Sequence, residues 1–208
     1  MQITLEKCGR RFNKEWIFRD LSFEFNAVDK IAVLGPNGSG KSTLLSVISG
    51  NMSLSEGNIS YNNGRLKVED LYQQVSFTAP YIDLIEEFTL LECLSFHFSF
   101  KKLMPGLSID DLPELLGLEK AKNKAIKYFS SGMRQRTRLA LACFENTPLL
   151  LLDEPTANLD LQGIEWYQKL IEDFGKNKLI VVASNQEHEY YFCHNFINIL
   201  DHKPSIVV

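Results

Sequence analysis

One short segment holds the residue types and the spacing needed to bind the phosphates of a nucleotide. It matches the pattern G-x-x-x-x-G-K-[ST]. Glycines let the backbone approach an anion closely, and successive N–H groups then turn toward it. The lysine can reach the β- and γ-phosphates, and the following serine hydroxyl suits Mg²⁺. The residues are Gly35, Pro36, Asn37, Gly38, Ser39, Gly40, Lys41, Ser42 and Thr43. The alternative, a glycine turn without a ligand, does not require the full motif.

A second group of candidate residues consists of two carboxylates, Asp153 and Glu154, directly after the apolar run Leu149–Leu152. Charges at the mouth of a buried strand cost desolvation energy unless a cation meets them. We expect Asp153 to hold Mg²⁺ and Glu154 to face the attacking water as a general base. The alternative is a strand that simply ends in solvent.

Alternating strands and helices must position these groups. Apolar runs predict buried strands, and longer amphipathic stretches predict helices between them. The alternation indicates an α/β fold with a mainly parallel sheet, whose ligand-binding loops follow the carboxyl ends of the strands. The expected strands are 31–34, 75–78, 148–153, 179–183 and 196–200, and the expected helices are 43–49, 130–145, 162–174 and a short one before residue 196.

Other segments differ from this alternating core. Residues 2–8 and 16–25 are expected to be strands joined by a polar turn at 9–14. Strands at 58–61 and 65–68 would flank Asn62-Asn63-Gly64, a hairpin signal. Residues 81–129 form a candidate helical insertion. Helices are expected at 89–100 and 110–116, although the alternation from Phe96 to Phe100 leaves a strand open there.

Composition limits the class of protein. The chain has 208 residues and a net charge of −4, which gives no electrostatic footprint for nucleic acid. It has no apolar run long enough to cross a bilayer and no apolar signal core at the N-terminus. The cysteines have no zinc-type spacing, so we expect reduced, mostly buried thiols in a cytoplasmic protein. They are Cys8, Cys93, Cys143 and Cys193.

Two further motifs narrow the family. The run Asp153–Asp160 (DEPTANLD) resembles the Walker B motif and D-loop of ABC-type ATPases, and Phe129–Arg136 (FSSGMRQR) resembles their signature motif. The order of motifs also matches, over nearly the whole chain. The resemblance implies a single ABC-type P-loop domain over 1–208, with a mainly parallel sheet core. It also implies an N-terminal antiparallel β subdomain and a helical subdomain inserted at about 81–129.

The resemblance also implies that ATP binds between two copies of the chain, with part of each site supplied in trans. Ser130 additionally suits a helix N-cap, and the two roles are compatible. The arginines 134, 136 and 138 are expected on a solvated or phosphate-proximal helix face. An aromatic ring near the first strands would stack on adenine, and both Phe12 and Trp16 are candidates. The residues implied to act in trans are Ser130, Ser131, Gly132, Met133 and Asp160.

The chain departs from the family pattern in three places: the position of Pro80, the position of Asn185 and the signature motif. Pro80 stands where the family has glutamine, and Asn185 stands where it has the switch histidine. His188, one helical turn after Asn185, is expected to point elsewhere. Ser131 and Met133 replace the usual glycine and glutamine of the signature. Because proline has no side-chain donor and an amide carries no charge, we expect slow but not absent ATP hydrolysis.

These features predict an ATP-binding and ATP-hydrolysing subunit that powers transport through separate transmembrane subunits. ATP and Mg²⁺ would be its cofactors, and a second copy would complete its sites. It would lie on the cytoplasmic face of the inner cell membrane, docking through apolar residues of 81–100, some of which would instead form the core of the insertion. The alternatives are a nucleotide-gated regulatory module with weak hydrolysis and a soluble ABC-type ATPase. No nucleic-acid partner is expected.

Overall fold

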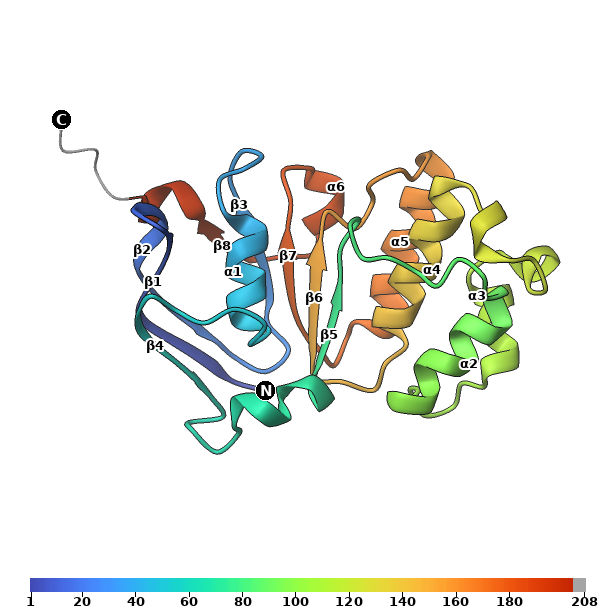
Figure 1. The fold of residues 1–208 in the computed structure, drawn as a ribbon, viewed down its shortest axis with the longest axis horizontal. Helices are drawn as coiled ribbons and strands as arrows, with labels where there is room; N and C mark the ends of the chain where they lie inside the picture. The colour runs from blue at the N-terminus through green and yellow to red at the C-terminus, as the bar shows by residue number, and fades with distance from the viewer. Residues whose placement is uncertain (204–208) are drawn as a thin grey trace.

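Two sheets form the frame of the molecule, whose residues 1–203 are described by a computed structural model (Figure 1). The parallel sheet has the order β5-β6-β7-β3-β8, and the antiparallel sheet has the order β2-β1-β4. The strands are β1 (Ile3–Phe12), β2 (Glu15–Phe25), β3 (Lys30–Leu34), β4 (Glu56–Tyr61), β5 (Val75–Thr78), β6 (Leu149–Asp153), β7 (Leu179–Ala183) and β8 (Asn195–Asn198).

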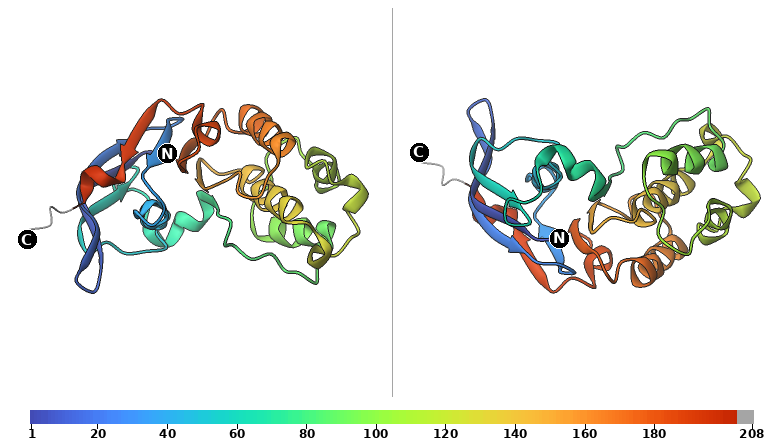
Figure 2. Two further views of the ribbon diagram at one scale, coloured as in Figure 1. Left: turned by 90° about the horizontal axis from the view of Figure 1, so that it is seen from above. Right: turned by 90° about the horizontal axis from the view of Figure 1, so that it is seen from below.

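Helices cover the parallel sheet and fill the insertion. The α-helices are α1 (Lys41–Ile48), α2 (Leu90–Phe100), α3 (Leu112–Leu115), α4 (Ser131–Cys143), α5 (Leu161–Phe174) and α6 (Glu187–Tyr190). Short 3-10 helices lie at Val68–Gln73, Ile109–Asp111, Glu119–Ala121, Ile126–Tyr128 and Ile199–His202. The antiparallel sheet and the helical insertion lie at opposite ends of the molecule (Figures 1 and 2).

The parallel sheet is buried on both faces, because successive side chains of a strand point to opposite sides. In β6, Leu149 and Leu151 join the apolar cluster that includes α1 and the antiparallel sheet. Leu150 and Leu152 join the cluster that includes α2, α4 and α5. A single apolar run therefore supports two cores, and β6 ends with the buried Asp153.

Two lysines, the buried Lys178 and the half-buried Lys30, hydrogen-bond to the carboxyl ends of the long helices. Lys178 Nζ donates to Cys143 O, at the last residue of α4, at 3.0 Å. Lys30 Nζ donates to Gly175 O, directly after α5, at 2.8 Å. Burial lowers the pKa of both amines. Each amine satisfies carbonyl groups that a helix leaves without an intrahelical partner.

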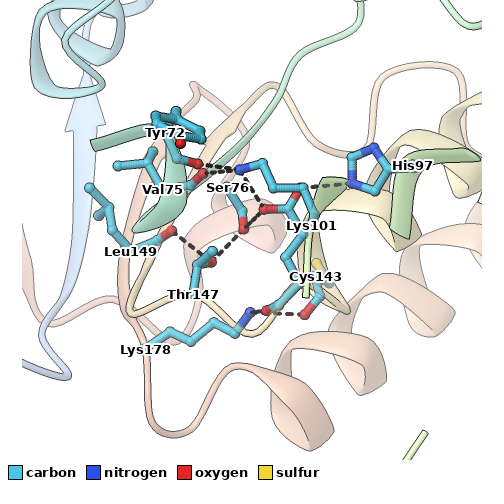
Figure 3. A network of polar contacts seen from close by, with 10 residues as sticks. Tyr72, Val75, Ser76, His97, Lys101, Cys143, Thr147, Leu149 and Lys178 are labelled. Carbon is cyan, nitrogen blue, oxygen red and sulfur yellow. Dashed lines mark hydrogen bonds and ion pairs between the residues drawn. The ribbon is translucent and has the colours of Figure 1, made fainter. Parts of the chain in front are cut away.

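A buried carboxylate, Glu145, joins the insertion to the core beside the amino ends of β5 and β6, and Figure 3 shows the side chains around it. Glu145 lies at the end of α4 and contacts His97 Nε2 at 2.8 Å and Lys101 Nζ at 3.1 Å, both from α2 and its C-terminal cap. Ser76 of β5 donates to the same carboxylate at 2.7 Å and contacts Thr147. We call these five residues the Glu145 network. It links α2, β5 and the α4–β6 connection.

Several predicted segments differ from the structure. Residues 65–68 are not a strand: only an isolated bridge joins Tyr61 and Leu66, and a 3-10 helix begins at Val68. The stretch from Phe96 to Phe100 is helical, because the capping box at Thr89 and Glu92 starts a helix that runs through it. The segment 110–116 is helical only in short pieces, and the last predicted strand ends at Asn198. The turn at 9–14 is much shorter, since β1 reaches Phe12 and β2 begins at Glu15.

The four cysteines lie buried and unpaired within residues 1–203, as the sequence predicted. No helix of this described part is both long and apolar enough to cross a membrane.

Candidate functional site

The glycine-rich loop joins the end of β3 to the start of α1 at the carboxyl edge of the parallel sheet. Gly35, Gly38 and Gly40 have φ values of 143°, 77° and 113°, which side chains rarely adopt. A Cβ at Gly40 would lie 2.2 Å from Ile17 Cγ2 of β2. The loop therefore requires glycine both for its backbone turn and for its packing on the antiparallel sheet.

The polar side chains of the loop turn inward. Lys41 is buried, and its Nζ donates to Gly35 O at 2.8 Å and to Pro36 O at 3.3 Å. Ser39 Oγ is buried and has no hydrogen-bond partner among the described residues. A buried hydroxyl without a partner is costly, and a phosphate oxygen would satisfy it. The loop thus fits an anionic ligand, with an ammonium and a hydroxyl beside the α1 N-terminus.

Asp153 ends β6 almost fully buried, and two hydroxyl groups meet its carboxylate. Tyr81 Oη donates to Asp153 Oδ2 at 3.2 Å, and Ser42 also hydrogen-bonds to Asp153. Burial raises the pKa of Asp153, while these hydrogen bonds and the Lys41 charge partly oppose the rise. Ser42 and Asp153 bring two hard oxygen donors together, and this donor set fits Mg²⁺.

Glu154 follows with a left-handed backbone, at φ 43°. Its N–H donates to Ala183 O at 2.9 Å, which fixes the residue beside the end of β7. A non-glycine residue in this region is strained unless its surroundings hold it there. The backbone turn directs Glu154 into a pocket of about 320 Å³, which Asn37, Asn158, Asn185 and His188 also line.

Asn185 reaches the glycine-rich loop directly. Its Nδ2 donates to Asn37 Oδ1 at 3.1 Å, across 148 residues of sequence. Both residues are exposed and line the same pocket as Glu154. The structure therefore brings together the candidate base, the loop and the residue in the switch position. The contact is a neutral amide pair, with no charged partner.

His188 does not point away from the site, contrary to the expectation from the sequence. It lines the pocket, and its Nε2 lies 2.9 Å from Thr156 Oγ1. Thr156 Oγ1 donates to Glu189 Oε1 at 2.5 Å, and Ser184 donates to the other oxygen of Glu189. A hydroxyl has one proton, so His188 Nε2 must be the donor to Thr156. The short helix α6 thus turns its imidazole back onto the segment after Glu154.

The signature residues occupy the N-terminus of α4. Ser130 accepts from Met133 N at 3.2 Å, which makes it the N-cap as expected. Ser130 and Ser131 are both exposed, and a Cβ at Gly132 would lie 3.3 Å from Asn158 O. The signature and the D-loop are thus packed together in one chain. Asp160, a candidate for contact in trans, also caps α5 by accepting from Gly163 N at 2.8 Å.

The arginines of α4 are not a solvated face, which corrects the expectation. Arg134 pairs with Glu86, and Arg136 donates to Leu116 O at 3.2 Å and lies over Trp166. Arg138 Nε donates to Ile82 O at 2.5 Å. All three bind α4 to the insertion or to the segment that enters it. The sequence did not reveal this role because their partners lie 20 to 56 residues away.

The structure separates the two candidates for adenine stacking. Phe12 ends β1 and is 43% exposed, with Arg10 over its ring at 4.7 Å. Trp16 is half-buried, with Arg19 at 4.7 Å and Arg11 at 5.4 Å from its ring. A Cβ at Gly9 would also meet Trp16 at 2.9 Å. Phe12 therefore has the more accessible ring.

The sequence profile of the ABC transporter family matches residues 18–157, which include the glycine-rich loop, the α4 N-terminus and Asp153-Glu154. The chain belongs to the ABC transporter family. The prediction of an ABC-type ATP-binding subunit is thereby confirmed, and the predicted fold class agrees with the sheets and helices described above.

Relatives span most of the chain. The lantibiotic transport ATP-binding protein SrtF of Streptococcus pyogenes is 29% identical, covering 88% of this chain and 79% of SrtF. The cytochrome c biogenesis ATP-binding export protein CcmA of Rhizobium meliloti is 30% identical, covering 89% of this chain and 92% of CcmA. MJ0796, a bacterial ABC transporter cassette solved as a dimer, has the same fold. Its TM-score is 0.80 at 24% identity, over 95% of this chain and 94% of that one.

Three residues of this ABC-type site were missed from the sequence. Thr156 and Glu189 form a buried hydrogen-bonded pair beside Glu154, and Tyr81 reaches Asp153. Glu189 could have been suspected, since an acid in a short helix beside a ligand loop requires a partner when buried. Tyr81 carries no periodic signal, because it lies in an irregular segment between β5 and α2.

Proposed function

We propose that this ABC-type subunit hydrolyses ATP to power transport through separate transmembrane subunits. The observation that carries the proposal is the shared pocket of Asn37, Glu154 and Asn185, beside Lys41 and Asp153. A phosphate-binding loop, a strained carboxylate and a polar switch position converge there. This is the arrangement that hydrolysis of a bound nucleoside triphosphate needs.

Each residue then has a defined role. Lys41 and the loop N–H groups bind the phosphates, and Ser39 supplies a further donor. Ser42 and Asp153 would hold Mg²⁺, which neutralises charge on the phosphate oxygens when bound. Glu154 would accept a proton from water, and Asn185 would donate a hydrogen bond near the γ-phosphate. Phe12 would stack on adenine.

Another copy of the chain would complete each ATP site. Ser130, Ser131, Gly132 and Met133 lie at an N-terminus that suits a phosphate, and Ser131 is exposed there. Asp160 is exposed at the start of α5. We infer that these residues close over ATP held by the second copy, and that residues 1–208 act as one domain with the insertion at about 81–129. The dimeric form of the MJ0796 cassette supports this arrangement.

The transmembrane partner would dock on the insertion side. Tyr81, Ile85, Phe96 and Phe100 are exposed apolar side chains of the segment 81–100, whereas Phe88 and Phe98 pack on the second core. Only part of the aromatic set is thus core. Docking there would hold the subunit on the cytoplasmic face of the inner membrane. The names of SrtF and CcmA, a transport and an export protein, support this proposal.

Hydrolysis should be slow but should depend on Glu154, since Pro80 and Asn185 lack the groups of the family pattern. We expect Glu154→Gln to lower ATPase turnover by about 100-fold or more, because general bases contribute about 10²–10⁴-fold. Nucleotide binding should persist, because the loop is unchanged. Phosphate release and binding of a fluorescent ATP analogue would measure both. An unchanged rate would exclude Glu154 as the base.

The same variant can identify the partner. Tagged Glu154→Gln protein, trapped with ATP in its native cell, should co-purify with a polytopic membrane protein, and Lys41→Ala provides the control without nucleotide. Recovery of soluble proteins alone would contradict a transport role.

A nucleotide-gated regulatory module is the second candidate, and the neutral Asn185–Asn37 contact favours it. That function predicts ATP-dependent association with its target at the same strength in wild type and in Glu154→Gln. Transport requires hydrolysis to reset the complex, so the wild-type complex should instead be shorter-lived.

A further inference from the structure

Tyr81 joins an exposed segment to a buried acid of the nucleotide site. The residue is 60% exposed, yet its Oη donates to Asp153 Oδ2 at 3.2 Å, and Asp153 is only 2% exposed. Burial of the hydroxyl and the neighbouring Asp153 raise the pKa of Tyr81 to about 12. In this geometry the phenol is the hydrogen-bond donor and the carboxylate oxygen of Asp153 is the acceptor.

The position of Tyr81 in the chain makes this contact informative. It directly follows Pro80, whose side chain can neither donate nor accept a hydrogen bond. Tyr81 begins the segment that leads from β5 into the insertion. The donor absent at Pro80 is thus supplied one residue later by a longer side chain.

A closed ring of contacts passes through this tyrosine. From Asp153 it runs through Tyr81 to Ile82, whose carbonyl accepts from Arg138 Nε of α4 at 2.5 Å. Arg138 contacts Gln135 Oε1 at 3.3 Å. The fully buried Gln135 donates to Pro155 O at 2.7 Å, directly after Glu154. The ring therefore returns to the strand end from which it started.

A second contact holds the same segment further along α4. The side chain of Glu86 pairs with Arg134, and the backbone carbonyl of Glu86 accepts from Lys127 N at 2.9 Å. The segment 81–86 thus lies along α4, the helix whose N-terminus presents Ser130. A shift of this segment would displace the donor to Asp153 and the contacts of α4 together.

We infer that Tyr81 is a positioning residue for the metal-binding carboxylate Asp153, and that it couples the insertion segment to the nucleotide site. The inference rests on the proposed nucleotide function and deepens it. A hydrogen bond from a neighbouring side chain holds a ligating carboxylate in one orientation, and loss of such a bond typically costs 10–100-fold in metal affinity or activity. The exposed ring of Tyr81, near Ile85 in the chain, would let a docked partner move the hydroxyl.

The test uses Tyr81→Phe, which removes only the hydroxyl. Mn²⁺ replaces Mg²⁺, and its affinity for the protein–ATP complex is measured by electron paramagnetic resonance. We expect about tenfold weaker Mn²⁺ binding. ATP binding without metal should be unchanged. Tyr72→Phe is the matched control, since Tyr72 is 63% exposed and its hydroxyl contacts Gln73 instead. Equal Mn²⁺ affinity in wild type and Tyr81→Phe would overturn the inference.

A second measurement does not need the loaded protein. Unfolding of wild type, Tyr81→Phe, Asp153→Asn and the double variant, all without nucleotide, forms a double-mutant cycle. If the two residues did not interact, the effect of the double variant on the unfolding constant would equal the product of the two single effects. We expect the effect of the double variant to be smaller than this product by a factor of at least about three, because the hydrogen bond is lost only once. Additive changes in the free energy of unfolding would show that the two side chains do not interact and would overturn the inference. A wild type that bound no Mn²⁺ with ATP would instead contradict the proposed function.

Discussion

Glu145 and Asp153 are both buried carboxylates, but their surroundings move their pKa values in opposite directions. For Asp153, burial outweighs two hydroxyl groups and a lysine, and the pKa is raised. For Glu145, burial also favours the neutral form, but His97, Ser76 and Lys101 together outweigh it and hold the pKa below 4.5. One carboxylate is therefore paired within the protein, whereas the other retains the capacity to bind a cation.

The Glu145 network should make stability depend on acid pH. Because the pKa is lowered in the folded state, the unfolded chain binds more protons between that pKa and 4.5. The stabilisation is complete above pH 4.5 and is lost as the pH falls through the folded-state pKa. Glu145→Gln should lower the free energy of unfolding by about 2 kcal/mol at pH 7 and flatten this dependence.

Urea denaturation between about pH 3 and pH 7 would measure the effect of Glu145→Gln. Glu56→Gln is the control, because Glu56 pairs with the exposed Arg19, and solvent screens such a pair so that it contributes little to stability. An identical acid dependence in wild type and Glu145→Gln would contradict the account.

At the scale of the element, regular patterns were predictable and irregular ones were not. The runs at 31–34, 149–153 and 179–183 are strands because their side chains are apolar on both faces of a covered sheet. The hairpin signal at Asn62-Asn63-Gly64 gave a turn but no second strand, since Val68 starts a 3-10 helix there. Local turn chemistry fixes the turn, whereas tertiary packing decides the structure of the segment after it.

The candidate site was predictable to the extent that contiguous motifs define it. The glycine-rich loop, Asp153-Glu154 and the cap at Ser130 carry their chemistry in neighbouring residues. The contacts of Tyr81, His188 and Arg138 do not, because each joins segments 32 to 72 residues apart. Their partners are set by the packing of the insertion on α4 and of α6 on the segment after Glu154.

The backbone of Val28, in a turn between two strands, is strained. It lies in the turn between β2 and β3 at φ 65°, where a β-branched side chain is unfavourable. It is 53% exposed, so little packing would be lost on substitution. Val28→Gly should raise the free energy of unfolding by about 0.5–1 kcal/mol, because relief of strain exceeds the entropy cost of glycine.

Thermal and urea unfolding would measure the change at Val28. Val68 is equally exposed at 51%, but its φ lies outside the left-handed region. Val68→Gly should therefore lower stability. A loss of stability in both variants would show that Val28 is not strained.

At the scale of the whole molecule, the glycine-rich loop and the signature end of α4 belong to different elements of one chain, and the proposed sites need both. If each site combines the loop of one copy with the signature of the other, two inactive variants can complement each other. Lys41→Ala damages only the loop, and Ser131→Arg blocks only the exposed signature. Their mixed dimer contains one intact site.

An equimolar mixture of Lys41→Ala and Ser131→Arg should therefore recover ATPase activity to about a quarter of the wild-type rate, since half of the dimers are mixed and each has one site. Each variant alone should be nearly inactive. The ATPase rate of the mixture, measured as a function of protein concentration, tests whether each ATP site is shared between two copies. No recovery above the sum of the separate variants would show that a site is complete within one copy.

The strand order also constrains how the chain can acquire its structure during synthesis. β3, which leads into the glycine-rich loop, lies between β7 and β8, so both of its edges pair with residues 179–198. When the loop leaves the ribosome, its strand has no sheet to join until about 150 more residues have been made. At about 5–20 residues per second, this takes roughly ten to thirty seconds. The first nucleotide motif to be synthesised is therefore among the last to become ordered, and newly made chains should acquire nucleotide affinity only after residues 179–198 have left the ribosome.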